Sequence, residues 1–257
     1  MTLTTKKTVM GKKYIIVMMV MSFAMLSFVS ATLSAEQINA AETAELEKDI
    51  LKEISKSQPN FLANDFPMIS PDFPAKGSAE EAKEVEYLQS LVTKRGNDVV
   101  ANIKAENEMI LASDFFEKEN LVVLKDKPNT KELLEMADED VMIFVLRAKY
   151  KYNRDRPNMV DNTLSTVVPV PPHSSYPSGH ATQSMVAALL MTEIDPKNEQ
   201  KYLAIATRIG KNREYAGLHF PSDTKAGVDF ARQMVDAMKQ NEGFKQKLEA
   251  AKSEFKV

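Results

Sequence analysis

The 257-residue sequence contains no cysteine, only 3 histidines and only 8 glycines. Without cysteine the chain cannot form a disulfide framework, a thiolate zinc site, an iron–sulfur cluster or a cysteine nucleophile. A metal centre built from several histidines would need nearly all three. Sparse glycine disfavours a dinucleotide-binding α/β fold and a turn-rich β-sandwich, and favours helices. With 44% hydrophobic and 27% charged residues, the chain can bury a substantial core and is not a disordered sequence.

The first 35 residues differ from the rest of the chain. A basic start precedes an almost wholly apolar, uncharged run at 14–29, and small residues follow it (Lys6, Lys7, Lys12 and Lys13 before the run; Ser30, Ala31, Ser34 and Ala35 after it). This order is typical of a secretory signal peptide, cleaved after Ala31 or Ala35. An uncleaved membrane anchor is the alternative, although the run is short for a span. We expect a signal peptide at 1–35 and an exported mature domain at 36–257, periplasmic or extracellular.

The mature chain is acidic. Removal of residues 1–35 leaves 29 basic and 36 acidic residues, a formal net charge of −7. Such a protein is a poor candidate for binding nucleic acid, whose phosphates attract basic surfaces. No later stretch of the sequence is long and apolar enough to cross a bilayer.

Apolar residues recur at helical spacing through most of the mature chain. Four prolines between residues 58 and 77 instead predict an extended surface segment, and Ser78 with Glu81 predicts a capping box at the next helix. The apolar runs 141–146 and 185–191 have long helix-forming flanks, so each predicts a buried helix. The expected helices cover 41–57, the residues after Ser78, 98–118, 131–152, 180–194, 197–215, 221–241 and 243–255. We expect an all-α protein with a single compact helical domain.

The first of three polar clusters contains Lys149 and Arg156 and is followed by Pro157. Seven residues are two helical turns, so both cations are expected on one face of a helix that ends at Pro157. Two cations at a helix end suit an anion with several oxygens. A solvated basic helix end is the alternative.

The second cluster, residues 176–180, reads Tyr-Pro-Ser-Gly-His directly before an apolar helix. Gly179 lets the backbone approach a ligand closely. Free N–H groups at the helix start and the Ser178 hydroxyl would form an anion site with His180 at its edge. An ordinary turn with an incidental histidine is the alternative.

The third cluster runs from Asn212 to Asp223. Pro221 suits the first position of a helix, and Asp223 follows His219 by four residues. A carboxylate there can accept a hydrogen bond from one ring nitrogen and leave the other free to attack. A purely structural histidine–aspartate pair is the alternative.

Together the clusters follow the pattern K-x6-R-P, P-S-G-H and R-x5-H-x3-D, in this order: Lys149/Arg156/Pro157, Pro177/Ser178/Gly179/His180 and Arg213/His219/Asp223. In this pattern, which spans residues 149–223, the sequence resembles the type 2 phosphatidic acid phosphatase superfamily. The surrounding residues most resemble the secreted bacterial class A non-specific acid phosphatases, an all-α family. One departure is Asn212, where the family usually has serine.

The resemblance implies a metal-independent acid phosphatase of broad specificity that hydrolyses phosphomonoesters through a phosphohistidine. It makes His219 the nucleophile and Asp223 the residue that orients it. It makes His180 the acid that protonates the leaving group and then activates water. Five residues would hold the phosphate oxygens: Lys149, Arg156, Arg213, Ser178 and Gly179. Because phosphoryl transfer depends mainly on positioning and charge, no metal and no other cofactor is expected.

Three other functions remain open: a membrane-associated lipid or isoprenyl phosphatase, a vanadate-dependent haloperoxidase, and a phosphate-binding protein without activity. The expected partners are small phosphomonoesters, with inorganic phosphate or vanadate as inhibitors. The sequence does not fix the physiological substrate, phosphotransfer to other alcohols, or whether the chain forms a homo-oligomer. His173, seven residues before His180, is either exposed or lines the mouth of the site.

Overall fold

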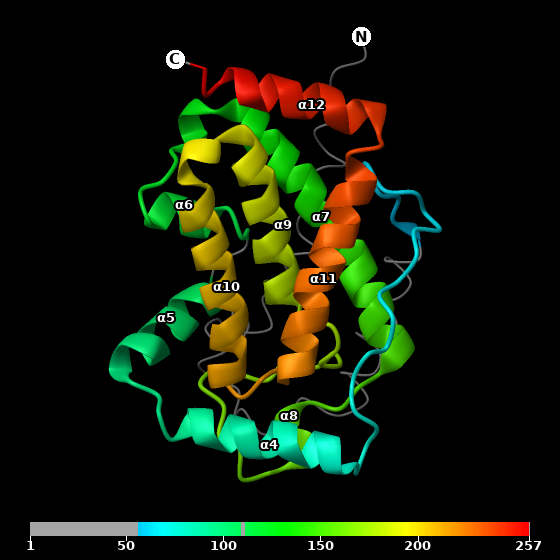
Figure 1. Cartoon of the computed structure of the whole chain (residues 1–257), viewed down its shortest axis with the longest axis vertical. Coiled ribbons are helices and arrows are strands. Elements are labelled where there is room, and N and C mark those ends of the chain that lie inside the picture. Colours follow the sequence, from blue (N-terminus) through cyan, green and yellow to red (C-terminus); the bar gives the residue numbers. More distant parts are fainter. Residues whose placement is uncertain (1–55, 109–110, 257) are drawn as a thin grey trace, which may run out of the picture. The chain divides into compact units, whose positions relative to one another are not determined.

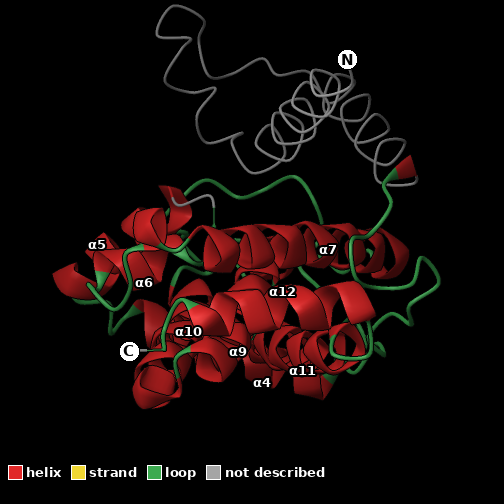
Figure 2. Cartoon of the chain, turned by 90° about the horizontal axis from the view of Figure 1, so that it is seen from above, coloured by secondary structure: helices red, strands yellow, loops and turns green. Residues whose placement is uncertain are grey.

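The computed structural model describes residues 56–108 and 111–256, in which every regular element is a helix (Figures 1 and 2). The predicted signal peptide at 1–35 and nearly all of the predicted helix at 41–57 lie outside these residues. The α-helices are α4 (Ala79–Val92), α5 (Asn97–Glu108), α6 (Asp114–Lys118), α7 (Pro128–Tyr152), α8 (Pro157–Val160), α9 (Gly179–Ile194), α10 (Glu199–Tyr215), α11 (Pro221–Met238) and α12 (Glu242–Ser253), with 3-10 turns η1 (Leu124–Asp126) and η2 (Pro196–Asn198). The all-α prediction is confirmed for the described residues.

Helix α9 is the central element, with α7, α10 and α11 packed against it (Figure 1). Of its 16 residues 11 are buried, and its apolar side chains point in all directions. A helix without a polar face is stable only where protein covers it on every side. This explains why the run at 185–191 forms the centre of the core. Helices α12 and α4 lie across opposite ends of the bundle (Figure 1).

Helix α11 contacts α9 closely at Gly227. A Cβ atom at this position would lie 2.7 Å from the carbonyl oxygen of Ser178 and 3.0 Å from the Cβ of Ala181. Only glycine avoids this overlap. The close crossing brings the first turn of α11 against the first turn of α9, and both turns carry residues of the predicted site.

The proline-rich segment contains no regular structure at residues 57–78, as expected, but it is not wholly at the surface, because Phe61, Leu62 and Ile69 are buried in the core. It is attached to α7 through the buried carboxylate of Asp140, which accepts hydrogen bonds from the N–H groups of Phe61 and Leu62, each 2.9 Å long. At its end Ser78 caps α4 by accepting from the Glu81 N–H at 3.1 Å. The Glu81 carboxylate, however, bonds the N–H of Gly77 at 2.6 Å. The predicted capping box is thus only half formed.

The single helix predicted at 98–118 is wrong, because α5 ends at Glu108 and α6 begins at Asp114. Ile103 of α5 and the adjacent Phe115 and Phe116 of α6 are all buried. In one continuous helix the two phenylalanines would point about 120° and 220° away from Ile103, at 100° per residue. The break lets both apolar groups reach the core. The other predicted helices are observed with their ends displaced by up to three residues.

Within residues 56–108 and 111–256, no helix combines the length and the apolar character that a membrane crossing needs.

Candidate active site

Lys149 and Arg156 do not share a helix, contrary to the prediction. Helix α7 ends at Tyr152 because Asn153 adopts a left-handed conformation with φ of 44°, which asparagine tolerates better than most residues. Arg156 is the extended N-cap residue of α8. Both cationic side chains are nevertheless buried, at 2% exposure each. The alternative of a solvated basic helix end therefore does not apply.

Main-chain carbonyls, most of them in the loop before α9, accept hydrogen bonds from these two cations. Lys149 Nζ donates to the carbonyls of residues 174 and 175 at 2.8 and 3.0 Å. Arg156 donates from Nε to the carbonyl of His173 at 3.0 Å and from Nη1 to the carbonyl of Leu218 at 2.9 Å. These partners are neutral, so they fix the positions of both cations without cancelling their charge.

His173 is half-buried and contacts a cation of the site. Its Nδ1 lies 3.1 Å from Nη2 of Arg156. Burial and the charges of Lys149 and Arg156 hold the pKa of His173 well below its ordinary value. The neutral ring can then accept a hydrogen bond from Arg156. Of the two placements left open by the sequence, the structure supports the one at the site.

The second cluster forms the N-terminus of α9. Ser178 is its N-cap and is fully buried, and the Ser178 N–H donates to the carbonyl of Asp223 at 3.0 Å. Gly179 is the first helical residue. A Cβ there would meet only ordinary contacts, 3.7 Å from Val145 Cγ1. No neighbour among the described residues therefore requires glycine at this position, whereas a ligand placed against the backbone would.

The turn after α10 returns the chain to place His219 beside Asp223. Gly217 has φ of 74°, and a Cβ on it would lie 2.9 Å from the carbonyl oxygen of Ser165. Asp223, in the first turn of α11, accepts the N–H of Phe220 at 2.8 Å. Its Oδ2 lies 3.5 Å from His219 Nδ1, which has no hydrogen-bond partner among the described residues. The two side chains are close but not hydrogen-bonded, and the orienting role of Asp223 stays a prediction.

Arg154 was missed by the sequence analysis. It pairs with Asp223 at 2.6 Å and with Glu84 of α4 at 2.8 Å, and its side chain is 4% exposed. Glu84 also accepts the N–H of Ser222 at 2.8 Å. Burial raises the pKa of Asp223, and the Arg154 guanidinium opposes that rise. The available signal was a second arginine two residues before Arg156, but the sequence does not reveal its carboxylate partners.

Arg213 lies in the last turn of α10 and is 1% exposed. Its Nη2 donates to the side-chain oxygen of Asn107 at 3.2 Å, while its Nε and Nη1 have no partner among the described residues. The preceding residue, Asn212, donates to the carboxylate of Glu106 at 2.8 Å. Glu106 and Asn107 belong to α5, which the sequence analysis treated only as part of a helix.

The three motif cations act on the same histidine. Burial and the charges of Lys149, Arg156 and Arg213 hold the pKa of His219 well below its ordinary value. Burial and, among the charges, chiefly Arg213 do the same to His180. Burial lowers the pKa of Arg156 to about 9 and that of Arg213 to about 10, so both stay cationic at neutral pH.

The arrangement therefore combines neutral imidazoles with fixed positive charge. Burial and Arg156 lower the pKa of Lys149 as well. Within the described residues none of the three cations forms a salt bridge, so their charge is available to an anion. In the same part of the chain, no three histidine or carboxylate side chains are grouped closely enough to hold a metal ion.

Known families resemble this part of the chain. Residues 140–240, which include every predicted site residue, match the PAP2 superfamily. Over this stretch, which is less than half of the chain, the sequence is similar to that superfamily. The predicted resemblance is thus confirmed, and the motif residues described above are those that carried it.

Several curated proteins similar to this chain are bacterial acid phosphatases. The non-specific acid phosphatase of Providencia stuartii is 33% identical over 136 residues, which cover 51% of this chain and 55% of the relative. That of Salmonella typhimurium is 34% identical over 122 residues, 42% of this chain and 47% of the relative. The acid phosphatase of Zymomonas mobilis is 31% identical over 113 residues, 42% and 43% respectively. The chain thus spans about half the length of the curated relatives it matches.

Solved structures share the fold at lower identity. A bacterial vanadium-dependent chloroperoxidase has a TM-score of 0.60 at 11% identity, covering 76% of this chain and 55% of its own. A bacterial vanadium-dependent iodoperoxidase has a TM-score of 0.54 at 20% identity, covering 73% and 57%. A transmembrane PAP2-type phosphatidylglycerolphosphate phosphatase from Bacillus subtilis has a TM-score of 0.51 at 18% identity, covering 66% and 88%. At such identities the likeness concerns the fold alone.

Proposed function

We propose that this protein is a metal-independent acid phosphatase that hydrolyses phosphomonoesters of broad structure through a phosphohistidine. The observation that carries the proposal is the group of three buried cations without salt-bridge partners among the described residues. Their charges act together on His219. Buried charge is costly unless it is compensated. A phosphoryl group, with three oxygens to be held and charge to be neutralised, matches this arrangement.

In the first step a ring nitrogen of His219 attacks phosphorus in line. The nitrogen–phosphorus bond forms as the ester oxygen–phosphorus bond breaks, and His180 gives its proton to the departing alkoxide. Lys149, Arg156, Arg213, the Ser178 hydroxyl and the Gly179 amide hold the phosphoryl oxygens. Asp223 stabilises the charged His219 ring. Its present 3.5 Å separation shortens on binding, as hydrogen bonds between catalytic groups often do.

In the second step water attacks the phosphohistidine and His180 takes up the water proton. The nitrogen–phosphorus bond breaks, inorganic phosphate leaves, and both histidines return to their starting states. Depressed histidine pKa values favour this chemistry in acid, because the attacking imidazole must be unprotonated. The product occupies the same oxygen-holding groups, so inorganic phosphate and vanadate inhibit by competition.

The acid phosphatase relatives support hydrolysis of small phosphoesters over the other activities considered. We further propose that residues 1–35 are a signal peptide, that the functional domain is 36–257, and that the mature protein is periplasmic or extracellular. Hydrolysis should persist in excess chelator. Vanadate-dependent halide oxidation, or hydrolysis restricted to lipid phosphates in a membrane fraction, would replace this proposal with one of its alternatives.

Rapid quenching with a labelled aryl phosphate tests the mechanism. His219→Ala should trap no label on the protein. His180→Ala should show a burst of bound label followed by slow turnover, because a nitrophenolate leaves without an acid whereas hydrolysis of the intermediate needs one. The same variant should lose about 10²–10⁴-fold on an alkyl phosphate. Absence of label in both variants, or equal slowing of the first step with aryl and alkyl substrates, would contradict the assigned roles.

A further inference from the structure

The last turn of α5 lies beside His180 although it precedes the region that matches the PAP2 superfamily. Residues 105–108 are the last four of this helix. The last four carbonyls of an α-helix have no partner within the helix, so they can accept hydrogen bonds from elsewhere. The main-chain carbonyl of Glu106 is one of them, and its hydrogen bond raises the pKa of His180 against the larger effect of burial.

The side chains of the same turn contact the end of α10. Asn107 accepts Nη2 of Arg213 at 3.2 Å. Glu106, 2% exposed, accepts the amide of Asn212 at 2.8 Å. Two consecutive residues of α5 thus hold two consecutive residues of α10, 106 positions further along the chain.

Arg213 is held by one edge only. With Nη2 bonded to Asn107, its Nε and Nη1 remain buried without a partner among the described residues. A guanidinium has a rigid planar fork, so fixing one nitrogen orients the other two. The Glu106 charge also opposes the fall in the pKa of Arg213 that burial causes, and so keeps the fork cationic. The direction in which the unpaired Arg213 N–H groups point therefore depends on α5.

We infer that Glu106 and Asn107 are positioning residues for Arg213: Asn107 aligns the guanidinium directly, and Glu106 fixes it through Asn212. The inference rests on the proposed function, because it assigns the free N–H groups of Arg213 to a phosphoryl group. It also explains the pairing of Asn212 with α5. The amide at this position reaches a carboxylate on another helix, so the change from serine carries an interaction of its own.

Calorimetric titration of the full chain with inorganic phosphate tests the inference without requiring turnover. Asn107→Ala should weaken phosphate binding about tenfold, the lower end of the effect of one hydrogen bond to a charged group. In an Arg213→Ala background the same substitution should change the dissociation constant less than twofold, because its target is gone. Lys149 and Arg156 provide the residual binding in that background.

The role of Glu106 is tested separately, with a conservative variant. Glu106→Gln keeps an oxygen for the Asn212 amide and should stay within about threefold of the parent, whereas Glu106→Leu should lose about tenfold. Glu108→Gln, the same chemical change at an exposed position of α5, is the matched control and should have no effect. Unfolding curves identify any variant that fails to fold. If a Glu106 variant fails, the comparison of Asn107→Ala in the parent and in the Arg213→Ala background decides the inference.

The outcomes separate this inference from the proposed function. If Asn107→Ala binds phosphate like the parent, or weakens binding equally with and without Arg213, the positioning role is wrong while the proposed function stands. If the parent chain binds neither phosphate nor vanadate and hydrolyses no phosphomonoester, the proposed function fails and this inference fails with it.

Discussion

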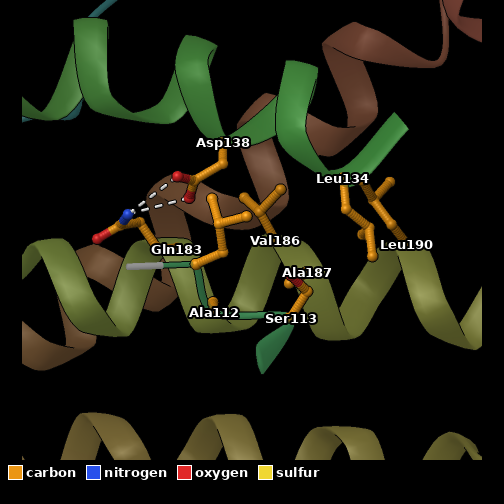
Figure 3. Close-up of a pocket in the computed structure, with 9 residues that line it drawn as sticks. Ala112, Ser113, Leu134, Asp138, Gln183, Val186, Ala187 and Leu190 are labelled. Carbon is orange, nitrogen blue, oxygen red and sulfur yellow. Dashed lines mark hydrogen bonds between the residues drawn. The ribbon is translucent and has the colours of Figure 1, made fainter. Parts of the chain in front are cut away.

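Replacement of Asp138 by asparagine should stabilise the protein above neutral pH and not in acid. Asp138 on α7 contacts Gln183 on α9, whose Nε2 lies 3.0 and 3.3 Å from its two carboxylate oxygens (Figure 3). The pair borders a cavity of about 10 Å³ lined mainly by apolar side chains, with room for roughly one water molecule. Burial raises the pKa of Asp138 from 3.8 to about 7, and the nearby charge of Asp114 adds to that rise.

The sign and size of this change in unfolding free energy follow from the linkage between protonation and folding. The folded carboxyl keeps its proton up to about pH 7, whereas the unfolded one loses it near 3.8, so stability falls as pH rises between these values. A shift of roughly 3 units corresponds to at most about 4 kcal/mol. Asp138 is only half-buried, and solvent screening reduces this to about 2 kcal/mol. For a domain of this size that is roughly 4–8 °C in melting temperature.

The measurement is the difference in unfolding free energy between Asp138→Asn and the parent, from pH 4 to pH 8. The difference should be near zero at pH 4 and should reach its full value above pH 7. The buried histidines, whose lowered pKa values weaken the fold in acid, contribute equally to both proteins and cancel. Asp236→Asn, an exposed position on α11, is the control. A difference that does not change with pH would refute the reasoning.

Two further predictions concern the charges around Asp223. Lys149→Met should move the acid limb of the kcat/KM profile to higher pH, because removal of a cation raises the pKa of His219 and protonates the nucleophile sooner. An unmoved or lowered limb in a nitrophenyl phosphate assay contradicts this. Arg154→Met should lower the unfolding free energy in urea by about 3–5 kcal/mol, since it leaves two carboxylates without their counter-ion. Glu84→Gln in the same chain should recover part of that loss, and a loss under about 1 kcal/mol would show that Arg154 is not a structural ion-pair partner.

The long helices were predictable because their apolar spacing agrees with their final burial. The run at 185–191 indicated a buried helix, and α9 is the helix that the others surround. The end of a helix was less predictable where the backbone conformation of a single residue determines it. Asn153 ends α7 through its left-handed conformation, so Arg156 lies outside the helix on which its seven-residue spacing from Lys149 placed it. The spacing of the motif was therefore wrong about the shared helix, and the set of site residues stays a prediction.

The supporting residues of the candidate site could not be predicted. Glu84 and Glu106 lie on helices rich in charged residues, where a carboxylate normally faces solvent. Only tertiary contact shows that each meets a buried partner more than 65 positions away, Arg154 in one case and Asn212 in the other. The distance in sequence between such a partner and the motif follows no fixed spacing. A pattern in the sequence can identify groups that touch a ligand, but it does not reveal the groups that hold them.

The balance of charge connects the depressed histidine pKa values with the proposed acid role of His180. Among the described residues, the site and its supports contain more cations than carboxylates: Lys149, Arg154, Arg156 and Arg213, with Arg208 3.7 Å from Glu106, against Glu84, Glu106 and Asp223. Burial and this excess of positive charge keep His180 and His219 neutral when no anion is bound. In the proposed mechanism a bound phosphomonoester dianion offsets the excess and so raises the pKa of the nearby imidazoles. His180 would then take up a proton as the substrate binds and act as the acid, whereas a histidine with an ordinary pKa would be partly protonated before binding.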